Sequence, residues 1–374
     1  MTEPAVPDPS PGTPGSDHVD WDLAAAAGRR LVPPGPQASR EEVGDLVAEL
    51  RQAAARAVEP VARTSRLQAP ADAPPPLVVD RPGWIEANVA SMRAMLGPLL
   101  DDVVARKRRS DQERAAAKGR TLGEPGPTAQ RIGGALTGTE LAALLSWVST
   151  KVLGQYDLAP QGTPRLLLVA PNIMHVEREL EVDPHDFRLW VALHEETHRV
   201  QFTAVPWLRS HVVDSARALG RDIVPDPDQL GERLKQIASQ LPGVIGGTVD
   251  VTTLLATPEQ RQALAEVTAV MSLLEGHADV VMDEVGPEVV PSVARIRERF
   301  DRRRKGAGAV DVVLRRLLGM EAKMRQYRDG AVFVRHVVDA VGWDGFNRVW
   351  ESAGTLPRAA EIPDPQAWVR RVHG

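Results

Sequence analysis

The stretch that most constrains this chain is His-Glu-Glu-Thr-His at residues 194–198, which has the pattern H-E-x-x-H. It lies in a segment from Phe187 to Phe202 that contains no Gly or Pro and whose apolar residues recur at helical spacing. On a helix, His194 and His198 lie one turn apart on the same face. That face continues the apolar stripe, so we expect both imidazoles to point inward.

Two imidazoles at this spacing can hold one Zn²⁺ at roughly 2.0–2.1 Å per nitrogen. Glu195 lies next to the first ligand, where it can accept a proton from a water molecule at the metal. The alternative is that the two histidines belong to a helical core, are hydrogen-bonded there, and bind no metal.

A second helical segment, about eighty residues later, presents Glu275 and Asp279 at the edge of its apolar stripe. Carboxylates facing a core are costly unless they are paired or bind a cation. Two imidazoles and one carboxylate form a catalytic zinc shell that leaves a fourth position for water. A ligating histidine usually donates its other N–H to a carboxylate, and Asp279 is placed to accept it from His194.

His277 is the competing third ligand. It is two residues from Glu275, so on a continuous helix it faces roughly the opposite way. A helix that ended before Gly276 would let His277 turn inward and complete a three-histidine site. A further alternative, a histidine six residues after His198, is excluded because that position is Ala204.

Composition sets wider limits. The chain has 374 residues, 43% of them hydrophobic, a net charge of −5 and no cysteine. Disulfides, thiol catalysis and cysteine-ligated zinc are therefore excluded, and the charge gives no case for nucleic-acid binding. No apolar run is long enough for a membrane span, and the N-terminus lacks the features of a secretory signal. We expect a cytoplasmic protein without a membrane or nucleic-acid partner.

The patterns predict a mainly α fold, with a Pro-rich tail over 1–18, a helical region over 19–134 and a catalytic domain over 135–374. The one clear strand is expected near 165–170, beside the metal-binding helix. It either pairs with an extended substrate or is a buried core strand. The less regular segment 203–262 is either a lid or a simple connection.

Hydrolysis by such a site needs a donor that stabilises a developing oxyanion. Tyr327 is our choice, because its hydroxyl is neutral at pH 7 and can donate a hydrogen bond. Lys323, Arg325 and His336 are the other candidates, and Tyr327 could equally be a packing residue.

H-E-x-x-H followed by E-x-x-x-D resembles the gluzincin metallopeptidases, which implies that Glu275 is the third zinc ligand and Asp279 the orienting acid. Longer stretches, VDWDLAAAAGRRLVPPGP (19–36), VVDRPGWIEAN (78–88) and EGHADVVMD (275–283) among them, are similar to an actinobacterial family. Its members are labelled zincin-like zinc-dependent metallopeptidases or coenzyme F420 biosynthesis-associated proteins.

This resemblance implies hydrolysis of a peptide or related amide bond, with Glu195 as general base and a peptide or protein as substrate. The rival hypothesis is a non-catalytic, zinc-binding regulatory or interaction protein, with or without a link to coenzyme F420. A retained Glu195 argues against it, since a purely structural zinc site needs no base.

Overall fold

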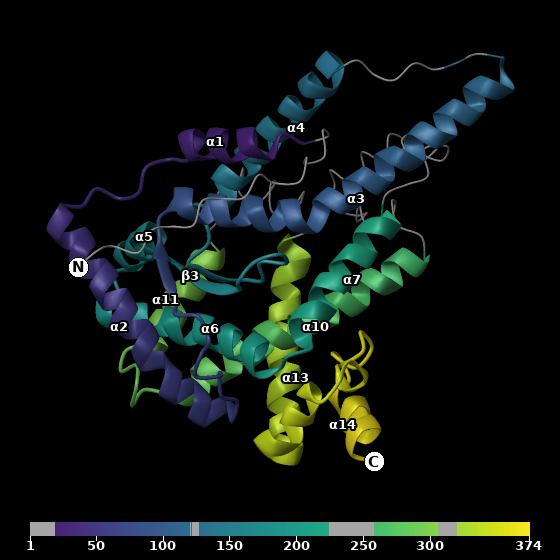
Figure 1. Cartoon of the computed structure of the whole chain (residues 1–374). Helices are drawn as coiled ribbons and strands as arrows, with labels where there is room; N and C mark the ends of the chain where they lie inside the picture. Colours follow the sequence, from purple (N-terminus) through teal and green to yellow (C-terminus); the bar gives the residue numbers. More distant parts are fainter. Residues whose placement is uncertain (1–18, 120, 122–126, 224–257, 306–319) are drawn as a thin grey trace.

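The computed structural model describes residues 19–119, 121, 127–223, 258–305 and 320–374, and this part of the chain is mainly helical, as predicted (Figure 1). The helices are α1 (Trp21–Leu31), α2 (Arg40–Ser65), α3 (Arg81–Ala117), α4 (Pro127–Val148), α5 (Ala170–Leu180), α6 (Pro184–Ala204), α7 (Leu208–Ile223), α10 (Pro258–Val285), α11 (Val293–Lys305), α13 (Met320–Phe346) and α14 (Pro365–His373). Two 3₁₀ turns follow α13, at Asn347–Trp350 and Ala353–Thr355. The strands are β1 (Leu77–Val79), β2 (Gly154–Asp157) and β3 (Arg165–Val169).

The three strands form one sheet in the order β1-β3-β2. β3 pairs in parallel with β1 and antiparallel with β2, with Leu167 opposite Leu77 and Leu168 opposite Gly154. The predicted strand near 165–170 is therefore confirmed. Its suggested pairing with substrate is wrong, because both edges of β3 are already hydrogen-bonded and it is the buried core strand instead.

Alternate side chains of β3 point into two different cores, as the two-residue repeat of a strand requires. Leu167 and Val169 belong to a smaller core built with α1, α3 and α4. Leu168 belongs to a larger core that includes α2, α5, α6, α10, α13 and α14. Figure 1 shows the first group of helices above the sheet and most of the second group below it. The sheet thus separates a supporting layer from the layer that carries the candidate site.

α6 starts where its sequence predicts a helix N-terminus. The side chain of Asp183 accepts a hydrogen bond from the Asp186 backbone N–H at 2.9 Å, and Pro184 occupies the first turn. The helix then runs without interruption to Ala204, so the whole H-E-x-x-H motif is helical, as predicted.

α10 is also continuous, and it passes through Gly276 without a break. Gly276 is where α10 crosses α13. A Cβ atom at Gly276 would overlap the backbone of Gly330, and one at Gly330 would overlap the carbonyl of Ser272. Two glycines therefore let the helix backbones touch, which fixes the register of α10 against its neighbours.

Contacts within the larger core join α2 to α6, and α1 packs on α4, so helices on both sides of residue 134 share cores. The division into 19–134 and 135–374 stays a prediction. The tail over 1–18 and most of the suggested lid, residues 224–257, lie outside the described residues. Within the described part, no helix is both long enough and apolar enough to cross a membrane.

Candidate metal centre

α6 and α10 bring His194, His198 and Glu275 together. The two Nε2 atoms lie 3.2 Å apart, and each lies 3.6 Å from Oε2 of Glu275. Ligands at about 2.0–2.1 Å from a tetrahedral zinc are roughly 3.3 Å from one another, so these spacings fit one ion between the three atoms. Among the described residues, this is the one group of His, Cys, Asp and Glu side chains whose donor atoms converge closely enough for a metal.

The other ring nitrogen of each histidine faces a side chain of the protein. Nδ1 of His194 lies 3.2 Å from the thioether sulfur of Met282, and Nδ1 of His198 lies 3.0 Å from Oε1 of Gln201. Sulfur and amide oxygen are acceptors, so both Nδ1 atoms carry hydrogen, which leaves the two Nε2 atoms as the positions that would bind a metal. The His194 side chain is still 30% exposed, which leaves solvent access on its side.

The charges at this group favour a cation. Burial lowers the pKa of His198, but the Glu275 carboxylate, together with smaller effects of Glu195 and Gln201, raises the pKa to about 9. In the absence of metal, His198 is therefore protonated at neutral pH and Glu275 faces an imidazolium. A metal ion can replace that proton and neutralise the same carboxylate.

The two glutamates between the histidines have different environments. Glu196 is fully buried and forms a bidentate ion pair with Arg199, at 2.6 and 2.7 Å, so its role is structural. Glu195 is 5% exposed, and burial, moderated by His198 and reinforced by Glu275, raises its pKa to about 8. A carboxyl group tuned in this way beside a metal site has the properties of a general base.

β2 passes directly over Glu195. A Cβ atom at Gly154 would lie 2.5 Å from the Glu195 carboxyl carbon, so any larger residue there would require the Glu195 side chain to move. Two residues on, Tyr156 stacks on Phe202 of α6 with ring centroids 5.3 Å apart. The strand thus lies along α6 and closes one side of the Glu195 carboxylate.

The roles predicted for Asp279 and Tyr327 stay predictions. Asp279 receives a hydrogen bond at 2.5 Å from Arg297, which also binds its backbone carbonyl. Tyr327 falls on α13, but its side chain, like those of Lys323 and Arg325, lies outside the described residues. His336 is exposed, with Nε2 lying 3.3 Å from the Gln366 side chain.

His277 does not join the cluster of His194, His198 and Glu275. It faces the core, fully buried, with its ring against Trp343, Phe346 and Trp350. Burial, with a smaller effect of the charge on His198, lowers its pKa to about 3. The alternative of a three-histidine site required α10 to end before Gly276, and the unbroken helix removes that condition.

Sequence reasoning missed Gly154, Gln201 and Met282. Gln201 had a signal, because it lies three residues after His198 and therefore on the same helical face. Met282 is likewise close in space to His194 but belongs to the other helix. Gly154 had no local signal, since its role depends on where β2 lies relative to α6.

The geometry can be compared with known proteins. The sequence profile described as zincin-like metallopeptidase matches residues 19–369. The chain belongs to the zincin-like metallopeptidase family. No curated protein matches it. Among solved structures, it is similar to a candidate hydrolase with a novel fold from Chloroflexus aurantiacus, at 28% identity and a TM-score of 0.63. That similarity covers 95% of this chain and 99% of the other.

Proposed function

We propose that this zincin-like protein is a zinc-dependent hydrolase that cleaves peptide or related amide bonds. The observation that carries the proposal is the convergence of His194, His198 and Glu275 beside a buried Glu195. A structural zinc site is usually closed by four protein ligands, whereas a catalytic site has three and an adjacent base. The family and the candidate hydrolase from Chloroflexus aurantiacus support the same chemistry.

A zinc ion held by these three side chains would supply a Lewis acid and would lower the pKa of water at the site. Glu195 accepts the proton of the attacking water and passes it to the leaving amine. Without a metal its pKa is about 8, and a cation nearby favours its ionised form, which is the form a base requires. Gly154 keeps the β2 backbone against this carboxylate and limits the positions it can take.

β2 offers a surface for an extended substrate. Within the described part of the chain it pairs with β3 on one side and with no strand on the other. Its backbone passes Glu195, so a peptide added to that edge would lie beside the base. This edge takes the role that the sequence had suggested for β3.

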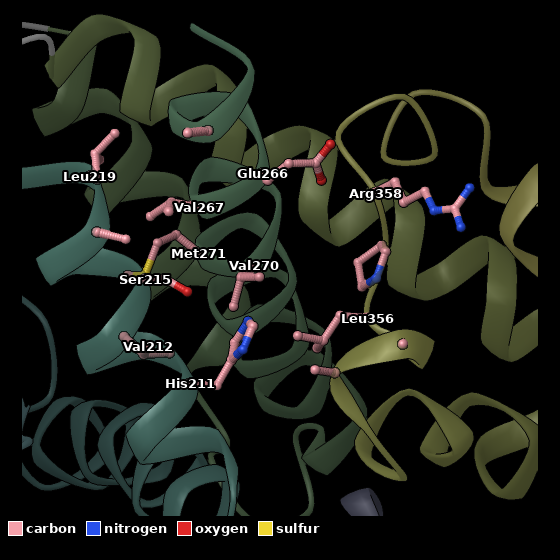
Figure 2. Close-up of a pocket in the computed structure, with 15 residues that line it drawn as sticks. His211, Val212, Ser215, Leu219, Glu266, Val267, Val270, Met271, Leu356 and Arg358 are labelled. Carbon is pink, nitrogen blue, oxygen red and sulfur yellow. The ribbon is translucent and has the colours of Figure 1, made fainter. Parts of the chain in front are cut away.

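A cavity of about 380 Å³ supports the expectation that the substrate carries an apolar side chain. α7, α10 and residues 353–358 form its walls, and Val267, Met271 and Leu356 line it (Figure 2). Met271 lies one turn before Glu275 on α10, so the helix that carries the proposed third ligand also forms one wall of the cavity. A cavity of this size lined largely by apolar groups is typical of small-ligand and side-chain pockets.

Metal content tests the first half of the proposal. We expect purified protein to carry about one zinc per chain, measured by plasma mass spectrometry against protein concentration. His194→Ala and Glu275→Ala should each lose stoichiometric zinc, because two remaining ligands bind too weakly. Full zinc retention by Glu275→Ala would overturn the third-ligand assignment.

A peptide library tests the second half. Cleavage should depend on zinc, should stop with chelator, and should favour peptides with an apolar residue beside the cleaved bond. A zinc-loaded chain that cleaves no peptide or amide would leave a binding protein as the better description. The association with coenzyme F420 is independent of this test and stays a prediction from resemblance.

A further inference from the structure

A chain of hydrogen bonds leads from His198 away from the metal group and into the core. Gln201, fully buried on α6, has Oε1 at 3.0 Å from His198 Nδ1. Its Nε2 lies 2.9 Å from the Leu274 carbonyl oxygen and 2.8 Å from His277 Nδ1. The Gln201 amide thus connects His198 on α6 to Leu274 and His277 on α10.

The partners determine which way this amide points. The Leu274 carbonyl can only accept a hydrogen bond, so the amide NH₂ of Gln201 must face it. The amide oxygen then faces His198, which must donate its Nδ1 hydrogen. The second amide hydrogen goes to Nδ1 of His277, which must accept. These assignments follow from the donor and acceptor types and need no observed hydrogen positions.

His277 carries a cost that packing alone does not explain. Its Nε2 is buried and has no hydrogen-bond partner in the described part of the chain. The ring lies against Phe346 at 5.4 Å, nearly parallel, and against Trp343 and Trp350 at steeper angles. An unpaired buried N–H is destabilising, and an apolar side chain in the same aromatic surroundings would avoid that cost.

We propose that Gln201 and His277 are positioning residues for the metal centre. They act through His198, which they hold with hydrogen on Nδ1 and the lone pair of Nε2 directed at the ion. His277 contributes by binding the second amide hydrogen of Gln201, which keeps the amide oxygen toward His198. The proposal rests on the metal-binding part of the proposed function and is independent of the reaction catalysed.

Zinc affinity, measured by competitive titration against a chromogenic chelator, tests the first link. Gln201→Leu should weaken zinc binding by roughly 10–100-fold, the usual effect of removing a hydrogen-bond partner of a ligating histidine. Gln262→Leu is the control, because Gln262 lies in an exposed part of α10 and bonds Glu266 instead. Unchanged affinity in Gln201→Leu would overturn the proposal.

A pair of His277 variants separates positioning from packing. In His277→Asn, the side-chain oxygen can still accept from Gln201, so zinc affinity should stay near that of the wild type. His277→Leu fills the same space without an acceptor and should bind zinc more weakly, though by less than Gln201→Leu, because Leu274 still holds one amide hydrogen. Equal losses in both variants would indicate a packing role and overturn the assignment to His277.

Nitrogen-15 NMR of the zinc-loaded protein gives a signature that a merely structural role would not change. In the wild type, His198 should show a metal-bound Nε2 and a hydrogen-bonded Nδ1–H. His277→Asn should keep this pattern, and His277→Leu should broaden or shift the Nδ1 signal.

A wild-type chain that binds no zinc would overturn the metal centre and this proposal together. A chain that binds zinc as described but hydrolyses nothing would overturn the proposed reaction alone.

Discussion

Two adjacent glutamates show that the role of a side chain depends on its surroundings as well as on its residue type. Glu195 and Glu196 have the same side chain and lie on the same helix. Glu195 lies against Gly154 of β2, whereas Glu196 is bound by Arg199. The 100° rotation between neighbouring residues of a helix is the cause. It directs Glu195 toward β2 and Glu196 into the fold.

Glu195→Gln should separate chemistry from structure. The amide keeps the size of the side chain but cannot accept the proton, so hydrolysis should fall by orders of magnitude. Zinc content and the thermal midpoint should stay close to those of the wild type. Glu196→Gln is the matched control and should do the reverse, lowering the thermal midpoint because Arg199 loses its buried anionic partner. Equal turnover by Glu195→Gln and the wild type would contradict the role of Glu195 as base.

Zinc binding should release protons in the pH range set by His198. Its pKa of about 9 in the metal-free protein lies above the ordinary value of 6.5, so at pH 7 the ring is protonated and must lose that proton to bind zinc. The apparent affinity should therefore rise with pH and level off above about 9. Calorimetry at pH 7 in buffers of different ionisation enthalpy counts the protons, and we expect at least one per zinc. A count of zero would mean that His198 is already neutral.

Among the elements, α10 contacts two neighbouring helices through adjacent residues. Its Glu275 faces α6, while Gly276, the next residue, meets α13. The glycine contact sets how deep α10 lies and therefore where Glu275 ends. The position of the Glu275 carboxylate thus depends on the crossing of α10 and α13, which is formed by another face of α10.

Gly330→Ala should destabilise the protein strongly. The added methyl group would overlap the Ser272 carbonyl on α10, and overpacking of this kind typically costs about 1–3 kcal/mol or more. Gly44→Ala is the control, because Gly44 lies in α2 with nothing within 4 Å of the added atom. It should instead raise the free energy of unfolding by about 1 kcal/mol, as alanine favours the helix. Urea denaturation measures both, and a Gly330→Ala protein as stable as the wild type would show that the helices can separate at no cost.

β2 gives a prediction of its own. Gly154→Ala places a methyl group on the Glu195 carboxylate, so the base must move and hydrolysis should fall by at least about tenfold, or about 1.4 kcal/mol in the barrier. Zinc content should be retained, because no ligand is touched. Gly162→Ala is the matched control, since its added atom meets Ala159 at an ordinary 3.6 Å and activity should not change. Loss of zinc from the Gly154 variant would mean that the substitution disturbs the zinc ligands and not only Glu195.

Considered as a whole, the molecule places the cluster of His194, His198 and Glu275 between two helices of one large core. A bound ion would connect α6 to α10, and both helices contribute to the same apolar cluster. A ligand that binds only the folded chain stabilises it by an amount that grows with ligand concentration over the dissociation constant.

Metal removal should therefore lower the thermal midpoint of the whole protein. At a free zinc concentration about a thousand times the dissociation constant, linkage predicts about 4 kcal/mol of stabilisation. Differential scanning calorimetry with zinc and with chelator measures the shift. His194→Ala should show the same midpoint in both conditions, because it lacks a ligand. A wild-type midpoint that does not respond to chelator would contradict a metal that connects the two helices.

Periodicity in the sequence was enough to predict the helical class and the local half of the site. His194, Glu195 and His198 lie on one helix, so their relative positions follow from 3.6 residues per turn. The stripe around Glu275 predicted its helix for the same reason. Loop and helix boundaries were less well predicted. α3 runs through Pro98, a residue that usually ends or bends a helix, and α4 begins at Pro127.

Tertiary structure alone decided how the helices meet. His198 and Glu275 are 77 residues apart in sequence, and only the packing of α10 on α6 and α13 brings the carboxylate to 3.6 Å from the imidazole. The same packing directs His277 into the aromatic core and aligns Gly154 with Glu195. Backbone periodicity is a local property of a chain, whereas these contacts depend on which surfaces exclude water together. The sequence determined which residues could bind a metal, and the fold decided which of them converge.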